Sequence, residues 1–275
     1  MIRNVLSIAG SDPSGGAGIQ ADLKTFAARG VYGMAALTAL TAQNTLGVWA
    51  VHLVPPNFVA EQIKAVFADI RIDAVKIGMI GDAAIAEAVA DAILAHRDIP
   101  IVLDPVMIAK GGAELLYPEA VEVLIERLLP LATLLTPNLP EAAALLREPV
   151  ADTRETMATQ AVRLQKLGSA NVLVKGGHLG GATSPDVLAT DQGLTWFEAR
   201  RTNTANTHGT GCTLSSALAA ELAKGATMQE AMSVAKTYLA RAVELASTLE
   251  VGSGHGPIQH FHEGCEWAVR PAASA

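Results

Sequence analysis

The residues best suited to chemistry lie in the stretch 206–218, towards the end of the chain. Directly before a leucine pattern with helical spacing stand two glycines, a threonine and a cysteine: Gly209, Thr210, Gly211 and Cys212. A turn of this kind points unpaired backbone N–H groups and the positive end of the helix dipole at one place. Such a place suits an anion, phosphate above all. The sequence therefore predicts an anion-binding turn with a thiol inside it.

Polar side chains also stand where predicted buried strands end. Asp104 follows a strand over 99–103, and Lys175 follows one over 171–174 and precedes two glycines. Because α/β proteins bind ligands at the carboxyl edge of the sheet, both side chains are placed to meet a ligand. A lysine there can touch a phosphate as a point charge. For Asp104, a turn residue or helix cap is the competing interpretation.

Asn138 and Glu141 begin the helix that follows another strand. Their spacing is that of an N-cap residue followed by a capping-box acid, in which each side chain bonds the backbone of the other. The residues alone therefore favour a structural role for both.

Two more segments leave their role open. The glycine-rich loop 10–18 matches neither the dinucleotide fingerprint nor the Walker A sequence. It predicts either close approach of backbone to a small ligand or an ordinary tight turn between strand and helix. Gln43 lies in the polar segment 41–45, where an amide either caps a turn or pairs with the donor and acceptor edge of a heterocycle.

Alternating strands and helices position these residues in one α/β domain. We expect a mostly parallel sheet with helices on both faces and a small hairpin element. The predicted strands are 3–9, 32–41, 47–54, 73–78, 99–103, one ending before 138, 171–174, and the hairpin 185–190 and 194–199. The predicted helices are one ending near 28, then 57–69, 82–96, one from 138, 153–167, one closed by Gly225, and 227–248.

Composition limits the classes of protein. The 275 residues are 50% hydrophobic and carry a net charge of −7, which argues against nucleic acid or an acidic membrane as a partner. The region 30–60 holds no Asp, Glu, Lys or Arg, yet polar residues and prolines interrupt it, so we expect two buried strands around a polar loop rather than a membrane span. Two cysteines and the lack of a signal-peptide pattern predict a cytoplasmic protein.

Taken together, the motifs resemble one known family. The segments 9–22, 208–212 and 254–257, with Asn138 and Glu141 between them, are similar to the hydroxymethylpyrimidine/phosphomethylpyrimidine kinases of thiamine biosynthesis, members of the ribokinase-like superfamily. The resemblance spans nearly the whole chain. It implies one kinase domain over 1–265, with 266–275 as a flexible tail.

The resemblance also implies an activity and a phosphate site. The family uses ATP to phosphorylate the hydroxymethyl group of a pyrimidine, and then phosphorylates the monophosphate to the diphosphate. By this match the 209–212 turn would stabilise the transferred phosphoryl group, and Lys175 would neutralise its oxygens. Asn138 and Glu141 match a motif that organises Mg²⁺ and phosphates, with Asp104 assisting through water.

The acceptor site follows from the same resemblance. The positions that match the pyrimidine site are Gly10, Ala17, Asp22, Gln43 and Met79. Cys212 stands where the wider superfamily usually carries aspartate. Because helix N-termini lower thiol pKa values, we expect a thiolate near neutrality that acts as general base towards the substrate hydroxyl.

Three other interpretations stay open. Cys212 could be a covalent nucleophile activated by His208, as in a hydrolase or acyl transferase. A pyridoxal-type kinase with the same turn would also phosphorylate a hydroxymethyl group on a nitrogen heterocycle. A pyrimidine-binding sensor without turnover is the non-enzymatic alternative. The family resemblance further implies a homodimer, to which the uncharged 30–60 region would contribute.

Overall fold

The computed structural model describes residues 1–108, 112 and 115–263, and its centre is an eight-stranded sheet. The strands of this sheet are β1 (Asn4–Ala9), β2 (Tyr32–Leu37), β5 (Ala74–Ile77), β6 (Ile101–Leu103), β7 (Leu134–Leu135), β8 (Asn171–Lys175), β9 (Thr183–Thr190) and β10 (Gly193–Arg200). Their order is β10-β9-β8-β7-β6-β5-β1-β2. The six strands from β8 to β2 run parallel, and β9 and β10 are antiparallel. The predicted mostly parallel sheet is confirmed.

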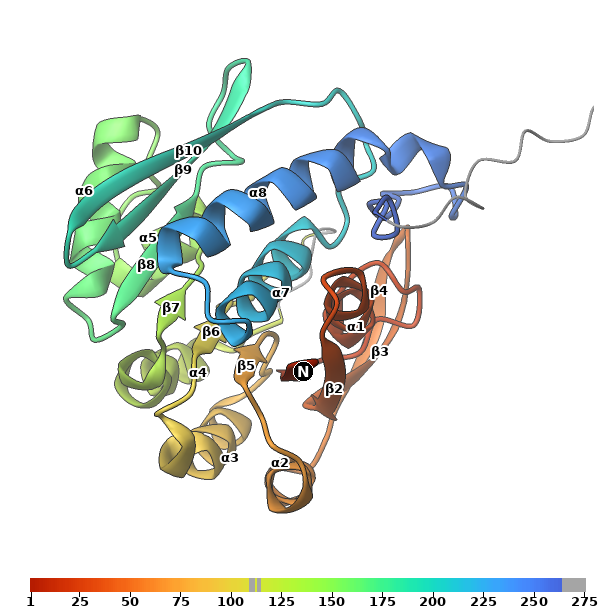
Figure 1. Ribbon diagram of the computed structural model, residues 1–275, viewed down its shortest axis with the longest axis vertical. Coiled ribbons are helices and arrows are strands. Elements are labelled where there is room, and N and C mark those ends of the chain that lie inside the picture. The colour runs from red at the N-terminus through yellow and green to blue at the C-terminus, as the bar shows by residue number, and fades with distance from the viewer. Residues whose placement is uncertain (109–111, 113–114, 264–275) are drawn as a thin grey trace, which may run out of the picture.

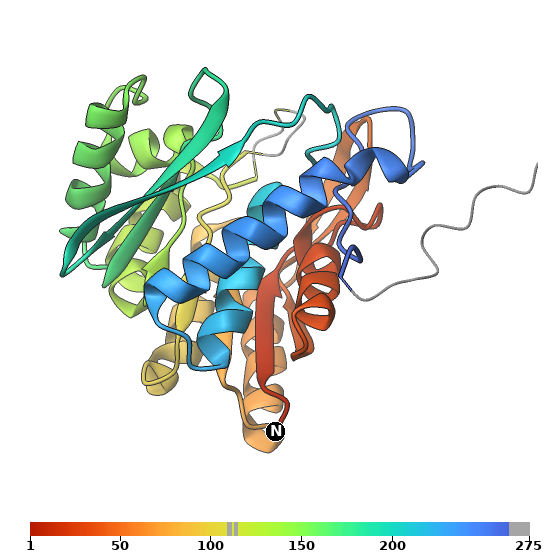
Figure 2. The same ribbon diagram turned by 45° about the horizontal axis from the view of Figure 1, so that its top comes forward.

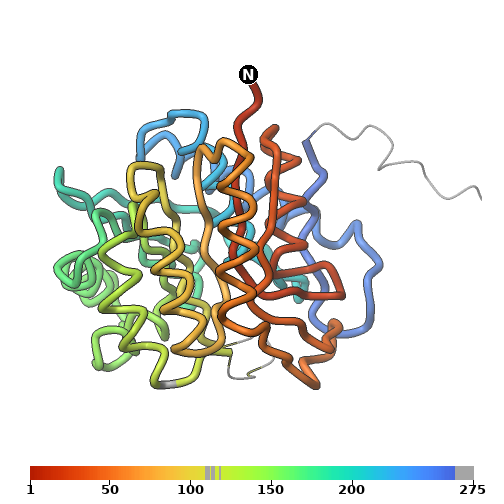
Figure 3. Tube along the Cα trace, turned by 90° about the horizontal axis from the view of Figure 1, so that it is seen from below, coloured from red at the N-terminus to blue at the C-terminus, as the bar shows by residue number. Residues whose placement is uncertain are grey.

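Helices cover both faces of the sheet (Figures 1 and 2). One face carries α1 (Gly18–Ala28), α7 (Thr210–Ala223) and α8 (Met228–Glu244). The other carries α2 (Pro56–Asp69), α3 (Ala83–Ile93), α4 (Pro118–Val123), α5 (Leu139–Leu146) and α6 (Arg154–Gln165). Figure 3 shows α2 and α3 side by side on that second face. No helix in the described part of the chain is long and apolar enough to cross a bilayer.

Two apolar cores hold these layers together, one on each face of the sheet. Along β1, Leu6 and Ile8 pack into the core under α2 and α3, whereas Val5 packs towards α1 and α7. Successive strand residues point to opposite faces, so a strand buried on both faces reads as a continuous apolar run. This is why the sequence shows little alternation in the central strands.

The uncharged region differs from the prediction. The strand expected over 32–41 breaks at Thr38 into β2 and β3 (Ala39–Asn44), and β3 pairs with β4 (Gly47–Leu53) in a separate two-stranded sheet. The expectation of two buried strands is wrong for β4, where Trp49 is 62% exposed. No charged residue marks the exposed strand, so composition could not distinguish it from a core strand.

Other boundaries are close to those expected. The hairpin predicted near 185–199 is confirmed as β9 and β10, and it extends the main sheet at the end opposite β3 and β4 (Figure 1). The helix predicted over 227–248 ends at Glu244, followed by a 3₁₀ turn over Ala246–Thr248. No local pattern predicted α4 or the π and 3₁₀ turns over Leu124–Leu131 that continue it. The predicted tail, 266–275, lies outside the described residues.

Candidate active site

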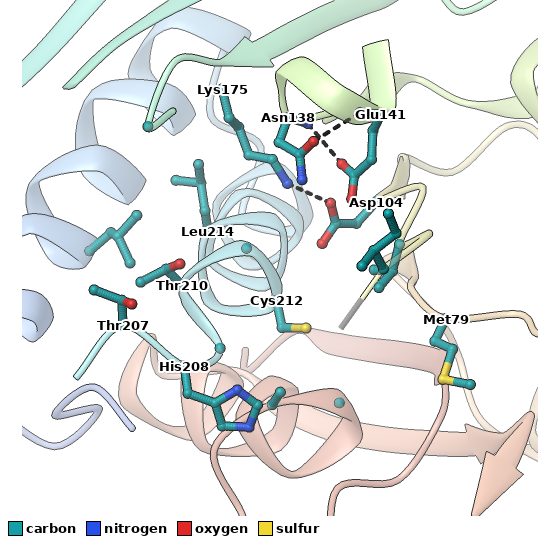
Figure 4. A pocket seen from close by; sticks show the side chains of 18 of the residues that line it. Met79, Asp104, Asn138, Glu141, Lys175, Thr207, His208, Thr210, Cys212 and Leu214 are labelled. Atoms are coloured by element: carbon teal, nitrogen blue, oxygen red, sulfur yellow. Dashed lines mark hydrogen bonds and ion pairs between the residues drawn. The ribbon is translucent and has the colours of Figure 1, made fainter. Parts of the chain in front are cut away.

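A cavity of about 680 Å³ opens at the carboxyl edge of the parallel strands, where polar residues were predicted to meet a ligand. Its lining joins the loop after β1, the strand β3, the ends of β6 and β8, and the first turn of α7. We call the part around Asp104, Glu141 and Lys175 the phosphate end, and the part around Gly10, Gln43 and Met79 the acceptor end. Cys212 lies between them (Figure 4).

The predicted turn before α7 is confirmed in position and in shape. Gly209 is the N-cap residue with φ of 82°, and no side chain caps the helix. A Cβ atom on Gly209 would lie 1.7 Å from the Gly16 carbonyl oxygen, so only glycine fits. The first three residues of the helix, Thr210, Gly211 and Cys212, all line the cavity. N–H groups in the first turn of a helix have no partner within the helix, so they can serve a ligand there.

At the phosphate end, Lys175 and Asp104 form a buried ion pair. Lys175 Nζ lies 2.7 Å from Asp104 Oδ1, and the hydroxyls of Thr136 and Ser215 also donate to this carboxylate. Burial raises the pKa of Asp104, but Lys175 and Lys76 outweigh it and hold the pKa below its usual range. The same carboxylate helps to raise the pKa of Lys175 against its burial. Both groups are therefore charged at neutral pH.

Asn138 and Glu141 form the predicted capping box at the start of α5. Asn138 Oδ1 accepts from the Glu141 N–H at 2.9 Å, and Glu141 Oε2 accepts from the Asn138 N–H at 2.8 Å. Both residues also line the cavity, so their capping role leaves them within reach of a ligand. Burial and the Asp104 charge raise the pKa of Glu141 to about 7, although Lys175 opposes them.

The two buried carboxylates fit a divalent cation. Among the described residues, no cluster of three or more His, Cys, Asp or Glu side chains could hold a metal alone. Mg²⁺ is usually held by one or two carboxylates together with phosphates and waters, and Asp104 and Glu141 supply such a pair. Burial and the Asp104 charge disfavour the ionised form of Glu141, and a bound cation would favour it.

The acceptor end is formed by backbone and neutral side chains. Gly10, Ala17, Gln43 and Met79 come from three segments and all line the cavity. A Cβ atom on Gly10 would lie 2.8 Å from Met79 Sδ, and one on Gly18 would lie 2.4 Å from the Gly10 carbonyl oxygen. The loop 10–18 is therefore a tight turn and a cavity wall at the same time.

Asp22 is not among the described residues that line this cavity. It is fully buried, and its carboxylate accepts from Ser7 Oγ at 2.6 Å, Ser216 Oγ at 2.7 Å and Lys76 Nζ at 2.9 Å. Lys76, which the sequence analysis did not single out, does line the cavity. Its position as a lysine within the apolar strand β5 could have marked it in the sequence as a site residue.

The pKa expected for Cys212 is wrong in direction. Burial raises the pKa of the thiol to about 11, Lys76 opposes this, and the carboxylates of Asp22 and Asp104 add to it. The helix N-terminus was the only influence visible in the sequence. Burial and the two carboxylates come from distant segments and outweigh it, so the thiol is protonated at neutral pH.

The alternative pair of Cys212 and His208 is not assembled as a nucleophile and its base. His208 Nε2 lies 2.8 Å from Asp12 Oδ2, and within the described part of the chain no hydrogen bond joins His208 to Cys212. The nucleophile interpretation needs such a bond. The pair of Asp12 and His208 was also missed, because the two residues are 196 positions apart.

One end of the cavity presents Lys175, two carboxylates and the turn before α7, and the other presents backbone and neutral side chains, which suits phosphoryl transfer to a small molecule. The fold is that of the ribokinase-like kinases. The chain belongs to the phosphomethylpyrimidine kinase family, whose model matches residues 12–259. It is therefore a phosphotransferase.

Similar proteins and structures support this family assignment. A hydroxymethylpyrimidine/phosphomethylpyrimidine kinase from Salmonella typhimurium is 55% identical over 94% of this chain and 97% of its own length. A phosphomethylpyrimidine kinase structure from Clostridium difficile is 43% identical, with a TM-score of 0.78 over 88% of this chain and 99% of that one. An ADP complex of Bacillus subtilis pyridoxal kinase is 37% identical, with a TM-score of 0.86 over 94% and 98%.

Proposed function

We propose that this kinase transfers the γ-phosphoryl group of ATP to the hydroxymethyl group of 4-amino-5-hydroxymethyl-2-methylpyrimidine, and then phosphorylates the monophosphate to the diphosphate for thiamine biosynthesis. The observation that carries the proposal is the meeting of Lys175 and the α7 turn with Gln43 in one cavity. A phosphoryl donor and a heterocyclic acceptor can therefore bind side by side.

The phosphate end would hold the phosphates of ATP. The N–H groups of Gly209, Thr210, Gly211 and Cys212 would stabilise charge on the phosphoryl oxygens, and Lys175 would neutralise it. Asn138, Glu141 and Asp104 would hold Mg²⁺, in part through water. The cation would supply further neutralisation of phosphate charge when bound.

The acceptor end would hold the pyrimidine between Gly10, Ala17 and Met79. The amide of Gln43 would pair with the ring nitrogen and the amino group. Asp22 would act without contact to the substrate, by holding Lys76 beneath the site.

Cys212 would accept the proton of the hydroxymethyl group as the oxygen attacks phosphorus. Its position between the two ends of the cavity supports this role, and the neighbouring Lys76 favours the thiolate. The raised pKa makes the thiolate a small fraction at neutral pH but a strong base.

A pyridoxal-type kinase is the second candidate, favoured by the likeness to the Bacillus subtilis pyridoxal kinase. A coupled ADP assay with the aminopyrimidine, its monophosphate and pyridoxal as acceptors separates the two. The proposal expects the highest kcat/KM with the two pyrimidines, and a higher value with pyridoxal would overturn it. Ligand binding without ADP release would instead favour the non-catalytic sensor.

Three further features complete the proposal: residues 1–265 act as one domain, the enzyme works in the cytoplasm, and it forms a homodimer. Exposed apolar side chains on β3, β4, the turn between these strands and the start of α2 support the last of these: Leu40, Leu46, Trp49, Val51 and Phe58. Water-exposed apolar groups gathered in one region favour burial against a second copy. Sedimentation showing a monomer at working concentration would contradict the dimer.

A further inference from the structure

A hydrogen bond between Asp12 and His208 joins the loop after β1 to the segment before α7, beside the acceptor end. Asp12 lies in the loop after β1 and His208 precedes the α7 turn, and the two side chains are largely buried. The imidazole covers Gly16, where a Cβ atom would lie 2.3 Å from His208 Cδ2. The ring therefore has a fixed place in the cavity wall.

The surroundings of Asp12 decide which ring nitrogen of His208 carries a proton. The Asp12 carboxylate also accepts from Ser14 N–H and O–H, Gly16 N–H and Ala17 N–H, at 2.6 to 3.1 Å. Burial raises its pKa, but the bonds from His208 and Ser14 outweigh burial and hold the pKa at about 2. An ionised carboxylate only accepts hydrogen bonds, so His208 Nε2 must donate, whether the ring is neutral or charged.

This proton in turn decides how the Gln43 amide is turned. Gln43 Nε2 lies 3.4 Å from His208 Nε2, and two N–H groups repel each other there. On the other side, Gln43 Oε1 lies 3.2 Å from Thr41 Oγ1, whose single hydrogen goes to the Ser11 carbonyl at 2.9 Å. The hydroxyl can then only accept from Gln43, so rotating the amide by 180° corrects the contacts on both sides. The contacts to His208 and to Thr41 therefore assign the same amide orientation, with Oε1 towards His208 and the NH₂ group towards Thr41.

We propose that Asp12 and His208 are positioning residues that fix the orientation of the Gln43 amide and so select an aminopyrimidine as phosphoryl acceptor. This inference rests on the proposed function. Gln43 lines the cavity, and in this orientation its amide keeps one N–H and one carbonyl lone pair for a ligand, in a fixed order. The carbonyl lies on the side of His208, which directly precedes the α7 turn.

The order of these two groups matches the substrate. On the pyrimidine ring the amino group is next to the hydroxymethyl group, and the ring nitrogen is one position farther away. A Gln43 carbonyl near the turn accepts from the amino group and directs the hydroxymethyl group towards the turn. The reversed amide would set N–H against N–H, and a site with mismatched polar groups rejects its ligand.

The test compares His208→Leu with His208→Gln, whose amide nitrogen takes the place of Nε2. The measurements are the acceptor kcat and KM, the ATP KM, and the inhibition constant of the 4-oxo analogue, in which a carbonyl replaces the amino group. For H208L we expect the aminopyrimidine KM to rise about tenfold. The preference for the aminopyrimidine, measured as the analogue inhibition constant divided by the aminopyrimidine KM, should fall by about the same factor. H208Q should stay within about threefold of wild type. If H208L weakens both ligands equally, or H208Q fails to restore the preference, the inference is wrong.

A measurement on the wild-type protein keeps the inference testable if H208L does not fold. Long-range ¹H–¹⁵N spectra of the histidine rings, assigned by the signal lost in H208Q, report which nitrogen of His208 is protonated. We expect a protonated Nε2 from pH 6 to 9, and an unprotonated Nε2 would overturn the inference. If the wild-type enzyme does not phosphorylate the aminopyrimidine, the proposed function is wrong, and the spectra still report the protonation of His208.

Discussion

The two ends of the cavity are built in different ways. At the phosphate end, charged side chains lie at or after the ends of the neighbouring strands β6, β7 and β8, and each is close in sequence to the strand that places it. At the acceptor end, the loop after β1 and the segment before α7 come from far apart and interlock through glycines, and the strand β3 adds Gln43. One end depends on charge and the other on close packing of backbone.

This difference predicts different kinetic consequences. Groups that meet charge developing in the transition state should control kcat, because they act most strongly when the phosphoryl group is in transit. Groups that pack against the ring should control acceptor KM and the choice of acceptor. The following substitutions test this division, from the largest expected effect to the smallest.

Lys175→Ala should cause the largest loss. Removing this cation leaves phosphate charge and Asp104 without their partner, so we expect kcat to fall by about 10³-fold while acceptor KM changes little. Steady-state kinetics measures both, with the exposed Lys64→Ala as the matched control. A loss in kcat below about tenfold would mean that the phosphate end does not depend on this charge.

Substitutions of Cys212 test the base through pH. With a thiol pKa of about 11, the thiolate fraction, and with it kcat/KM, should rise by about tenfold per pH unit between pH 7 and 10. Cys212→Ala should lose about 10²-fold or more and the pH dependence with it. Cys212→Asp, ionised throughout this range, should give a flat profile. Activity of C212A within a few-fold of wild type would remove Cys212 as the base.

Gln43→Leu should affect the acceptor end alone. Loss of the amide should raise the aminopyrimidine KM by about tenfold with a smaller change in kcat, because the phosphate end is intact. The ATP KM should be unchanged. Substitution of His52, an exposed residue on the neighbouring strand β4, serves as control. An equal loss with every acceptor would show that Gln43 supports the fold rather than the ligand.

Asn138 should give the smallest effect and separates a cap from a ligand-binding group. Asn138→Ala removes the cap of α5 and should lower the free energy of unfolding by about 1 kcal/mol, whereas Asn138→Ser keeps a capping oxygen and most of that stability. Chemical denaturation measures the free energy of unfolding, and kcat reports whether Asn138 also acts on the phosphate. If kcat of N138S matches wild type, Asn138 is a cap and has no separate role towards phosphate.

What the sequence could predict follows the same division. The α7 turn, the strand-end residues Asp104 and Lys175, and the capping box were visible because each is a local pattern beside its own strand or helix. The Cys212 pKa was not, because it depends first on burial and then on Lys76, Asp22 and Asp104, which reach it from three other segments. The pairing of Asp12 with His208 and the exposed hairpin of β3 and β4 depend on long-range packing that no local pattern records.

The most direct measurement is a ³¹P NMR time course of the enzyme with ATP, Mg²⁺ and 4-amino-5-hydroxymethyl-2-methylpyrimidine. The account predicts a phosphomonoester signal that rises first and is then replaced by the two signals of a diphosphate ester, as ATP is converted to ADP. ATP consumption without a phosphorylated pyrimidine, or no consumption beyond that seen without acceptor, would contradict it.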